Sequence, residues 1–72
     1  MPTSRLESEV TGTVWKIEVH AGEVVREGQT LVILESMKME IPLVAPHAGS
    51  VLELMVEEGE AVTEGQPLVV IG

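Results

Sequence analysis

The sequence predicts an all-β protein, a flattened antiparallel β-sandwich built from an internal pseudo-twofold repeat. Residues 12–34 can be laid over residues 49–71 without a gap, so that three glycines recur in register: Gly12, Gly22 and Gly28 meet Gly49, Gly59 and Gly65. Glycine or proline interrupts the chain every few residues, which argues against a long helix. β-branched residues fill the intervals, as is typical of short strands. A common period indicates one fold unit used twice.

The two halves are expected to interlock in one small domain. About 35 residues cannot bury an adequate core alone. The chain has 72 residues and no cysteine for disulfides, so its stability must come from an aliphatic core, with Trp15 as the one aromatic residue. We expect the domain to span residues 9–72 and residues 1–8 to form a frayed N-terminal tail.

The first half predicts three strands. Residues 13–19 alternate, which places Trp15, Ile17 and Val19 on one face of a half-buried strand and Val14, Lys16 and Glu18 on the other. Residues 20–23 turn the chain, residues 24–25 form a minimal strand, and residues 26–29 turn it again. Residues 30–34 then form a buried strand that leads toward Lys38.

The second half repeats this plan after a return strand over residues 39–45 and a turn over residues 46–49. Seven or eight short strands are therefore expected. The counterpart of the turn at Lys38, one repeat away in either direction, falls at or just beyond the two ends of the chain. Lys38 should consequently project from the pole opposite both termini.

Composition argues against several functional classes. The formal net charge of -8 disfavours nucleic acid and anionic membranes, because both need lysine and arginine to meet phosphate. His20 and His47 lie far apart in turns without nearby cysteine, so no metal site is expected. The longest apolar runs are too short to cross a bilayer, and the first residues lack an apolar signal-peptide core, so we expect a cytoplasmic protein.

The tip of the central hairpin has unusual residues. Two-residue hairpin turns need positive φ, so Asn-Gly, Asp-Gly or Gly is common there, whereas this chain has Met37-Lys38. Left-handed angles at both residues would cost about 1–3 kcal/mol each. Such strain persists more readily where the exposed side chains have a function.

With these features the chain resembles the biotinyl domain, or biotin carboxyl carrier protein, of the biotin/lipoyl attachment family. The resemblance runs from Thr11 to Ile71 and rests on four motifs: the Met37-Lys38-Met39 triplet, the Ala45-Pro46 to Gly49 turn, and the Glu-Gly-Gln turns at residues 27–29 and 64–66. The first half aligns with the second without an insertion, so the chain is similar to thumbless members. Family members most often have alanine where this chain has Ser36, a difference that removes no needed chemistry.

The resemblance implies a barrel-sandwich hybrid fold and a non-catalytic carrier. Lys38 would be the covalent biotin attachment residue, Met37 and Met39 its recognition neighbours, and Glu35 a ligase or partner contact. The implied partners are a biotin protein ligase, a biotin carboxylase and a carboxyltransferase, between which a monomeric carrier domain shuttles carboxybiotin. The parent system would be a biotin-dependent carboxylase or decarboxylase.

Two alternatives stay open. Lipoyl carrier domains share the fold and the central lysine, although they typically show Asp-Lys-Ala at the tip. An unmodified barrel-sandwich interaction module is the second alternative, and such modules lack the Met-Lys-Met tip.

Overall fold

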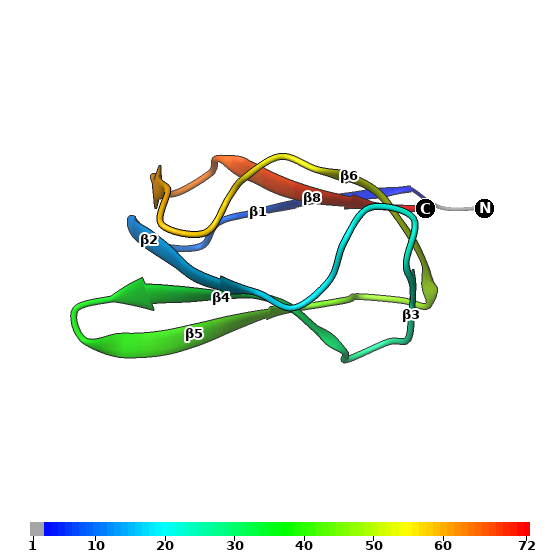
Figure 1. The fold of residues 1–72 in the computed structure, drawn as a ribbon, viewed down its shortest axis with the longest axis horizontal. Helices are drawn as coiled ribbons and strands as arrows, with labels where there is room; N and C mark the ends of the chain where they lie inside the picture. Colours follow the sequence, from blue (N-terminus) through cyan, green and yellow to red (C-terminus); the bar gives the residue numbers. More distant parts are fainter. Residues whose placement is uncertain (1–2) are drawn as a thin grey trace.

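Eight strands form two four-stranded sheets that lie face to face. The computed structural model describes residues 3–72, with strands in chain order β1 (Ser4–Glu7), β2 (Gly12–Ile17), β3 (Val24–Val25), β4 (Thr30–Ser36), β5 (Met39–Val44), β6 (Gly49–Leu54), β7 (Ala61–Val62) and β8 (Pro67–Ile71). One sheet has the order β1-β8-β6-β3 and the other β5-β4-β2-β7. All strand pairs are antiparallel, and Figure 1 shows β1, β6 and β8 above β4 and β5. The predicted fold class is confirmed.

The two halves interlock through equivalent hydrogen bonds. Gly22 N donates to Val51 O at 2.8 Å, and one repeat later Gly59 N donates to Val14 O at 2.7 Å. Each bond joins a turn of one half to a strand of the other half. Because both glycines have φ near +90°, a conformation that residues with a side chain rarely adopt, these turns explain why the glycines recur.

The core lies between the sheets and is entirely aliphatic, as predicted. Its buried members come from both halves: Val14, Val19, Val25, Leu31, Val32, Leu34, Ala45, Val51, Val56, Val62, Leu68, Val69 and Ile71. Leu6, Ile41 and Leu43 are among the partly buried residues that pack against this cluster. Removal of these side chains from water is the main stabilising term available to a chain without disulfides.

The predicted faces of β2 are wrong, because the strand contains a bulge. Val14 pairs with Leu34 and is fully buried, whereas Lys16 pairs with Ile33, so Trp15 is an extra residue in β2. A bulge breaks the alternation that a regular strand imposes. Val14 therefore enters the core, and Trp15, expected on the face that also carries Ile17 and Val19, is 48% exposed.

The predicted frayed tail is wrong for residues 4–8. Residues 4–7 form β1, which pairs with the edge of β8, and Leu6 packs against the core. Ser8 is buried, and its N–H donates to Gln66 O at 2.9 Å. Backbone pairing with an open sheet edge holds this segment, so it needs only one apolar side chain. Residues 1–2 lie outside the described residues.

The hairpin between β4 and β5 forms one end of an elongated molecule. The principal extents are 35 × 18 × 17 Å, and in Figure 1 this hairpin lies at the opposite end from the C-terminus and from the start of β1. The predicted position of Lys38 at the pole away from the termini is therefore confirmed. Within residues 3–72 the structure contains no helix with the length and apolarity needed to span a membrane.

Candidate functional site

The candidate site is the two-residue turn that joins β4 to β5. Ser36 and Met39 are the last paired residues of the two strands, so Met37 and Lys38 alone make the turn. Their φ angles are +53° and +67°. Positive φ at both central positions is the requirement of a type I′ turn, whose twist matches that of the flanking strands. The predicted left-handed angles are confirmed, and they occur at residues that bear side chains.

The base of the hairpin is fixed against β2. The Ser36 hydroxyl donates to Thr11 O at 3.0 Å. Gly12 lies against the backbone of β4, its neighbour in the sheet, since a Cβ added to Gly12 would overlap Glu35 O and lie 3.2 Å from Ser36 Cβ. Only glycine allows the two backbones to approach this closely. The turn therefore extends from a rigid support, although it is itself exposed.

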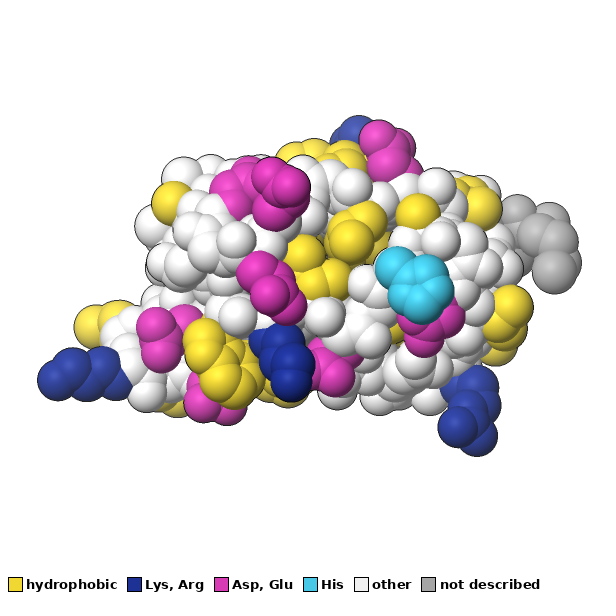
Figure 2. All heavy atoms as spheres, viewed as in Figure 1, with side chains coloured by type: hydrophobic (Ala, Val, Ile, Leu, Met, Phe, Trp, Pro, Cys, Tyr) yellow, Lys and Arg dark blue, Asp and Glu magenta, His cyan; other side chains and the backbone are white. Residues whose placement is uncertain are grey.

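The side chains of the turn face solvent. Met37 is 91% exposed and Met39 63%, and Lys38 is exposed between them. Among residues 3–72 the ion pairs are Lys16–Glu18 at 3.7 Å and His20–Glu23 at 3.3 Å, neither of which involves Lys38. Figure 2 shows a basic side chain at the extreme hairpin end, with acidic and apolar side chains behind it. The Lys38 amine is thus presented to solvent and to partners.

Two carboxylates flank the turn on one face of the sheet. Glu35 on β4 and Glu40 on β5 are directly opposite each other and both exposed. Like charges in this position destabilise a strand pair. Net negative potential near the amine favours a partner surface with arginine or lysine.

The structure brings all four predicted site residues, Lys38, Met37, Met39 and Glu35, into one hairpin. Their assigned roles in attachment and recognition stay predictions. Sequence reasoning did not identify Gly12 as the support of the hairpin or Trp15 as an exposed residue of the same sheet. The recurrence of Gly12 as Gly49 was a usable signal for the first, because both glycines lie against the backbone of the other strand.

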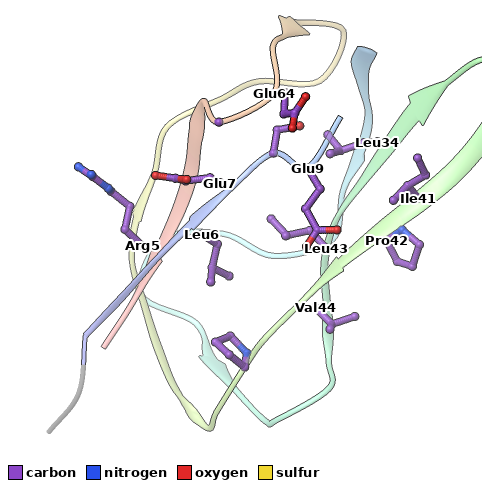
Figure 3. A pocket seen from close by; sticks show the side chains of 13 residues that line it. Arg5, Leu6, Glu7, Glu9, Leu34, Ile41, Pro42, Leu43, Val44 and Glu64 are labelled. Atoms are coloured by element: carbon purple, nitrogen blue, oxygen red, sulfur yellow. The ribbon is translucent and has the colours of Figure 1, made fainter. Parts of the chain in front are cut away.

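A groove lies between the two edge strands β1 and β5, away from the turn. This groove of about 610 Å³ is lined by aliphatic residues, including Leu34, Ile41 and Leu43, and by carboxylates. Figure 3 shows Glu9 and Glu64 near its upper end, with Leu34 beside them. The Ser8 hydroxyl in the lining already donates to Val10 O at 2.6 Å. The groove therefore has no activated nucleophile among its described lining residues.

The two histidines lie in separate environments. His47 Nδ1 is 2.8 Å from Ala48 O, and its Nε2 is 2.9 Å from the Ser4 hydroxyl, so both ring nitrogens have partners within the fold. His20 lies beside Glu23. Residues 3–72 contain no group of three or more His, Cys, Asp or Glu that could hold a metal ion.

Sequence comparison finds a family model and curated relatives that match this chain. The family model described as "Biotin-requiring enzyme" matches residues 3–71. The biotin/lipoyl attachment protein of Bacillus subtilis is 51% identical over 41 residues, which are 57% of this chain and 56% of that protein. The biotinylated protein TB7.3 homolog of Mycolicibacterium smegmatis is 53% identical over 38 residues, 53% of this chain and 54% of that one. The matched region thus spans about half the length of these curated relatives.

Solved structures give similar matches. A single-chain, multi-domain long-chain acyl-CoA carboxylase superimposes with a TM-score of 0.88 at 35% identity, over 94% of this chain and 7% of that chain. The urea carboxylase of Kluyveromyces lactis superimposes with a TM-score of 0.92 at 32% identity, over 100% of this chain and 6% of its own. In both cases the similarity is to a small part of a much larger protein.

Proposed function

Because this chain belongs to the biotin-requiring enzyme family, we propose that it is a biotin carboxyl carrier whose Lys38 Nζ is joined to biotin by an amide bond. The single observation that carries this assignment is the turn itself. Lys38 is exposed, has φ of +67° and lies in none of the ion pairs among residues 3–72. A primary amine in this position can act as the nucleophile that attacks an activated acyl group, such as an acyl-adenylate made by a ligase, with AMP as the leaving group.

The chain presents the amine and a partner enzyme activates it. A protonated amine has no free electron pair, so only the neutral form of a lysine amine attacks an acyl group. A biotin protein ligase must therefore remove the proton when it binds the hairpin. The chain's own contribution is position: the turn is held on β2 by the Ser36 hydroxyl and by the close approach at Gly12. Fixed position lowers the entropic cost of bringing the amine to the ligase.

The methionines are proposed to be recognition residues. Met37 and Met39 flank the amine and are mostly exposed, so their apolar surface is removed from water when a partner covers the turn. Their flexible thioether side chains adapt to grooves of different shape. This property suits a hairpin that several enzymes bind in succession. Glu35 is proposed to contact an arginine or lysine of the ligase or of a later partner.

The proposed partners after loading are a biotin carboxylase and a carboxyltransferase. Biotin, when attached, accepts a carboxyl group at one enzyme and gives it up at the other. Attachment to Lys38 keeps it near both sites at an effective concentration of about the millimolar range. The carrier orients this arm and catalyses neither step. We propose a cytoplasmic location, which the absence of cysteine favours.

Intact-mass measurement of the protein purified from its native cells tests the proposal, together with an avidin blot. One biotinyl group is expected on the wild-type chain and none on Lys38→Arg, which keeps the positive charge and removes the nucleophilic amine. Lys16→Arg is the matched control, because Lys16 is also exposed but ion-paired to Glu18, and it should keep the group. A lipoyl group would instead support the lipoyl carrier alternative, and an unmodified wild-type lysine would support the interaction module.

A further inference from the structure

The outer face of the β5-β4-β2 sheet differs from its symmetry-related counterpart in a way that the fold does not require. Both halves contain the same bulge: the register shifts between Val14 and Lys16 in β2 and between Val51 and Glu53 in β6. The extra residue is Trp15 in the first case and Leu52 in the second, and both side chains are exposed. The bulge is thus a feature of the scaffold, whereas the residue placed on it is free to vary.

Trp15 lies on a face that continues to the attachment hairpin. Two residues of a bulged strand oppose one residue of the partner strand, so Trp15 and Lys16 lie opposite Ile33. Ile33 pairs with Pro42 on β5, and two residues further on Glu35 pairs with Glu40. Alternation places Ile33 and Glu35 on one face of β4, away from the buried Val32 and Leu34. We call this set, Trp15, Ile33, Pro42, Glu35 and Glu40, the bulge face. Lys16 lies on the same face beside Trp15, and its charge is paired with Glu18.

The equivalent positions at the other end of the molecule lack these features. Leu52 stands in place of Trp15 and packs over Gly72, since a Cβ added to Gly72 would overlap the Leu52 side chain. In the repeat, Gly72 and Thr3 occupy the positions of Glu35 and Glu40. The aromatic residue and the opposed carboxylates therefore occur together, at the pole that carries Lys38.

Tryptophan that is half exposed on a small acidic domain is typical of a binding surface. Tryptophan is enriched among residues that dominate interface energetics, where it fills a pocket bordered by polar contacts. Glu35 and Glu40 face each other at a cost to the isolated fold, and a basic partner would offset that cost. The bulge face thus fits a protein surface that has an apolar recess with arginine or lysine beside it.

The short lysine side chain favours the enzyme that loads Lys38 as the partner, over the enzymes that act after loading. An enzyme that modifies a bare lysine must bring its reacting atom within about 3–3.5 Å of Nζ, so it has to close on the hairpin itself. Enzymes that act on the far end of the attached group can reach it while contacting only the Met-Lys-Met tip, because the arm spans the remaining distance. Ile33 is five residues before Lys38 in the sequence, about 16 Å at strand spacing, which lies within the footprint of an ordinary interface.

We propose that the bulge face, with Trp15 as its anchor, is the docking surface for the enzyme that loads Lys38. The inference rests on the proposed function. It adds a contact away from the Met-Lys-Met tip and specifies the partner as having an apolar recess for an indole with a basic border.

Steady-state loading kinetics with a biotin protein ligase, ATP and biotin test the docking surface. Trp15→Ser should raise KM for the carrier by about tenfold or more with kcat nearly unchanged, because the interaction is made in the bound complex and persists in the transition state. Leu52→Ser is the matched control at the equivalent bulge and should leave both constants within about twofold. Raising salt should increase the wild-type KM, since the carboxylates meet a basic border. Equal KM values for Trp15→Ser and wild type would overturn the inference.

A second measurement avoids substitution and so does not depend on the variant folding. Trp15 is the sole tryptophan, so 5-fluorotryptophan labelling of the wild-type chain gives one fluorine resonance. Unlabelled ligase without ATP should change the chemical shift of that resonance, because the indole moves from solvent into a protein recess. A resonance that only broadens, or that stays unchanged, at ligase concentrations that support loading would overturn the docking surface while leaving the proposed function intact. Failure of the wild-type chain to accept biotin at all would instead overturn the proposed function.

Discussion

Gly12→Ala should destabilise the domain strongly, because Gly12 on β2 lies against the backbone of the neighbouring strand β4. An added Cβ would overlap Glu35 O and lie 3.1 Å from Glu35 C and 3.2 Å from Ser36 Cβ. Carbon and carbonyl oxygen normally approach to about 3.3–3.6 Å, so one strand must move by about 1 Å. Glu35 cannot yield easily, since it is paired with Thr13 on one side and with Glu40 on the other. Overpacking of this kind costs about 1–3 kcal/mol, and we expect the upper end of that range.

Urea unfolding and thermal melting measure this loss, with Gly49→Ala as the matched control. A loss of about 3 kcal/mol corresponds to a fall in melting temperature of roughly 12–24 °C for a chain of this size. At Gly49 the added Cβ would lie 2.6 Å from Gly72 O, a smaller overlap, and Gly72 is bonded in the sheet through Ser50 alone. Gly49→Ala should therefore cost about 1–2 kcal/mol. The close-approach argument is refuted if Gly12→Ala stays within about 0.5 kcal/mol of wild type or is the milder of the two.

Three further substitutions test other parts of the structure. Met37→Asn should raise the free energy of unfolding by about 0.5–1 kcal/mol, because asparagine tolerates positive φ. The same substitution should lower the loading rate. Urea unfolding and ligase kinetics measure the two effects, and unchanged stability would argue against strain in the turn. Leu6→Ala should cost about 1–2 kcal/mol and increase amide exchange over residues 4–8, whereas a frayed segment would show neither effect. Ser36→Ala should cost about 0.5–1.5 kcal/mol through loss of the bond to Thr11 O, with loading retained; abolished loading would mean that Ser36 has a chemical role.

The repeat made the architecture predictable from sequence, and the exceptions arise where one residue breaks a local rule. Alternation along residues 13–19 fails because Trp15 is an extra residue in β2, and hydrophobicity alone cannot distinguish a bulged strand from a regular one. Val14 recurs as Val51 and Trp15 as Leu52, so each half has two adjacent apolar residues at the bulge. Either residue of each pair could face the core. Backbone pairing with the neighbouring strand decides which of the two faces the core, and the side chains of one strand do not reveal that pairing.

The strand β1 was within reach of the same repeat. Leu6 and Ser8 lie one period before Leu43 and Ala45, and each pair shares an environment: both leucines pack on the core, and Ser8 and Ala45 are both buried. The hydrogen bond from Ser8 N to Gln66 O recurs as the bond from Ala45 N to Gln29 O. Extension of the repeat from residue 12 toward the N-terminus therefore predicts this strand. Apolar content alone does not, because polar residues surround Leu6.

The candidate site was predictable in place and in backbone conformation, but not in its surroundings. A two-residue hairpin turn needs positive φ at one or both central residues, and here Met37 and Lys38 both have it. The bulge face depends on strands β2, β4 and β5 lying side by side with a shifted register. Such an arrangement comes only from the assembled sheet.

The most direct test of the account is to locate the modified residue by tandem mass spectrometry after loading of the purified chain with ligase, ATP and biotin. The chain contains two lysines, both exposed, and they differ in setting: Lys38 lies in the strained turn, whereas Lys16 lies in β2 and is ion-paired to Glu18. We expect one biotinyl group, on Lys38 Nζ, in every loaded molecule. A biotinyl group on Lys16, or a chain that stays unmodified when the same ligase loads a known carrier, would contradict it.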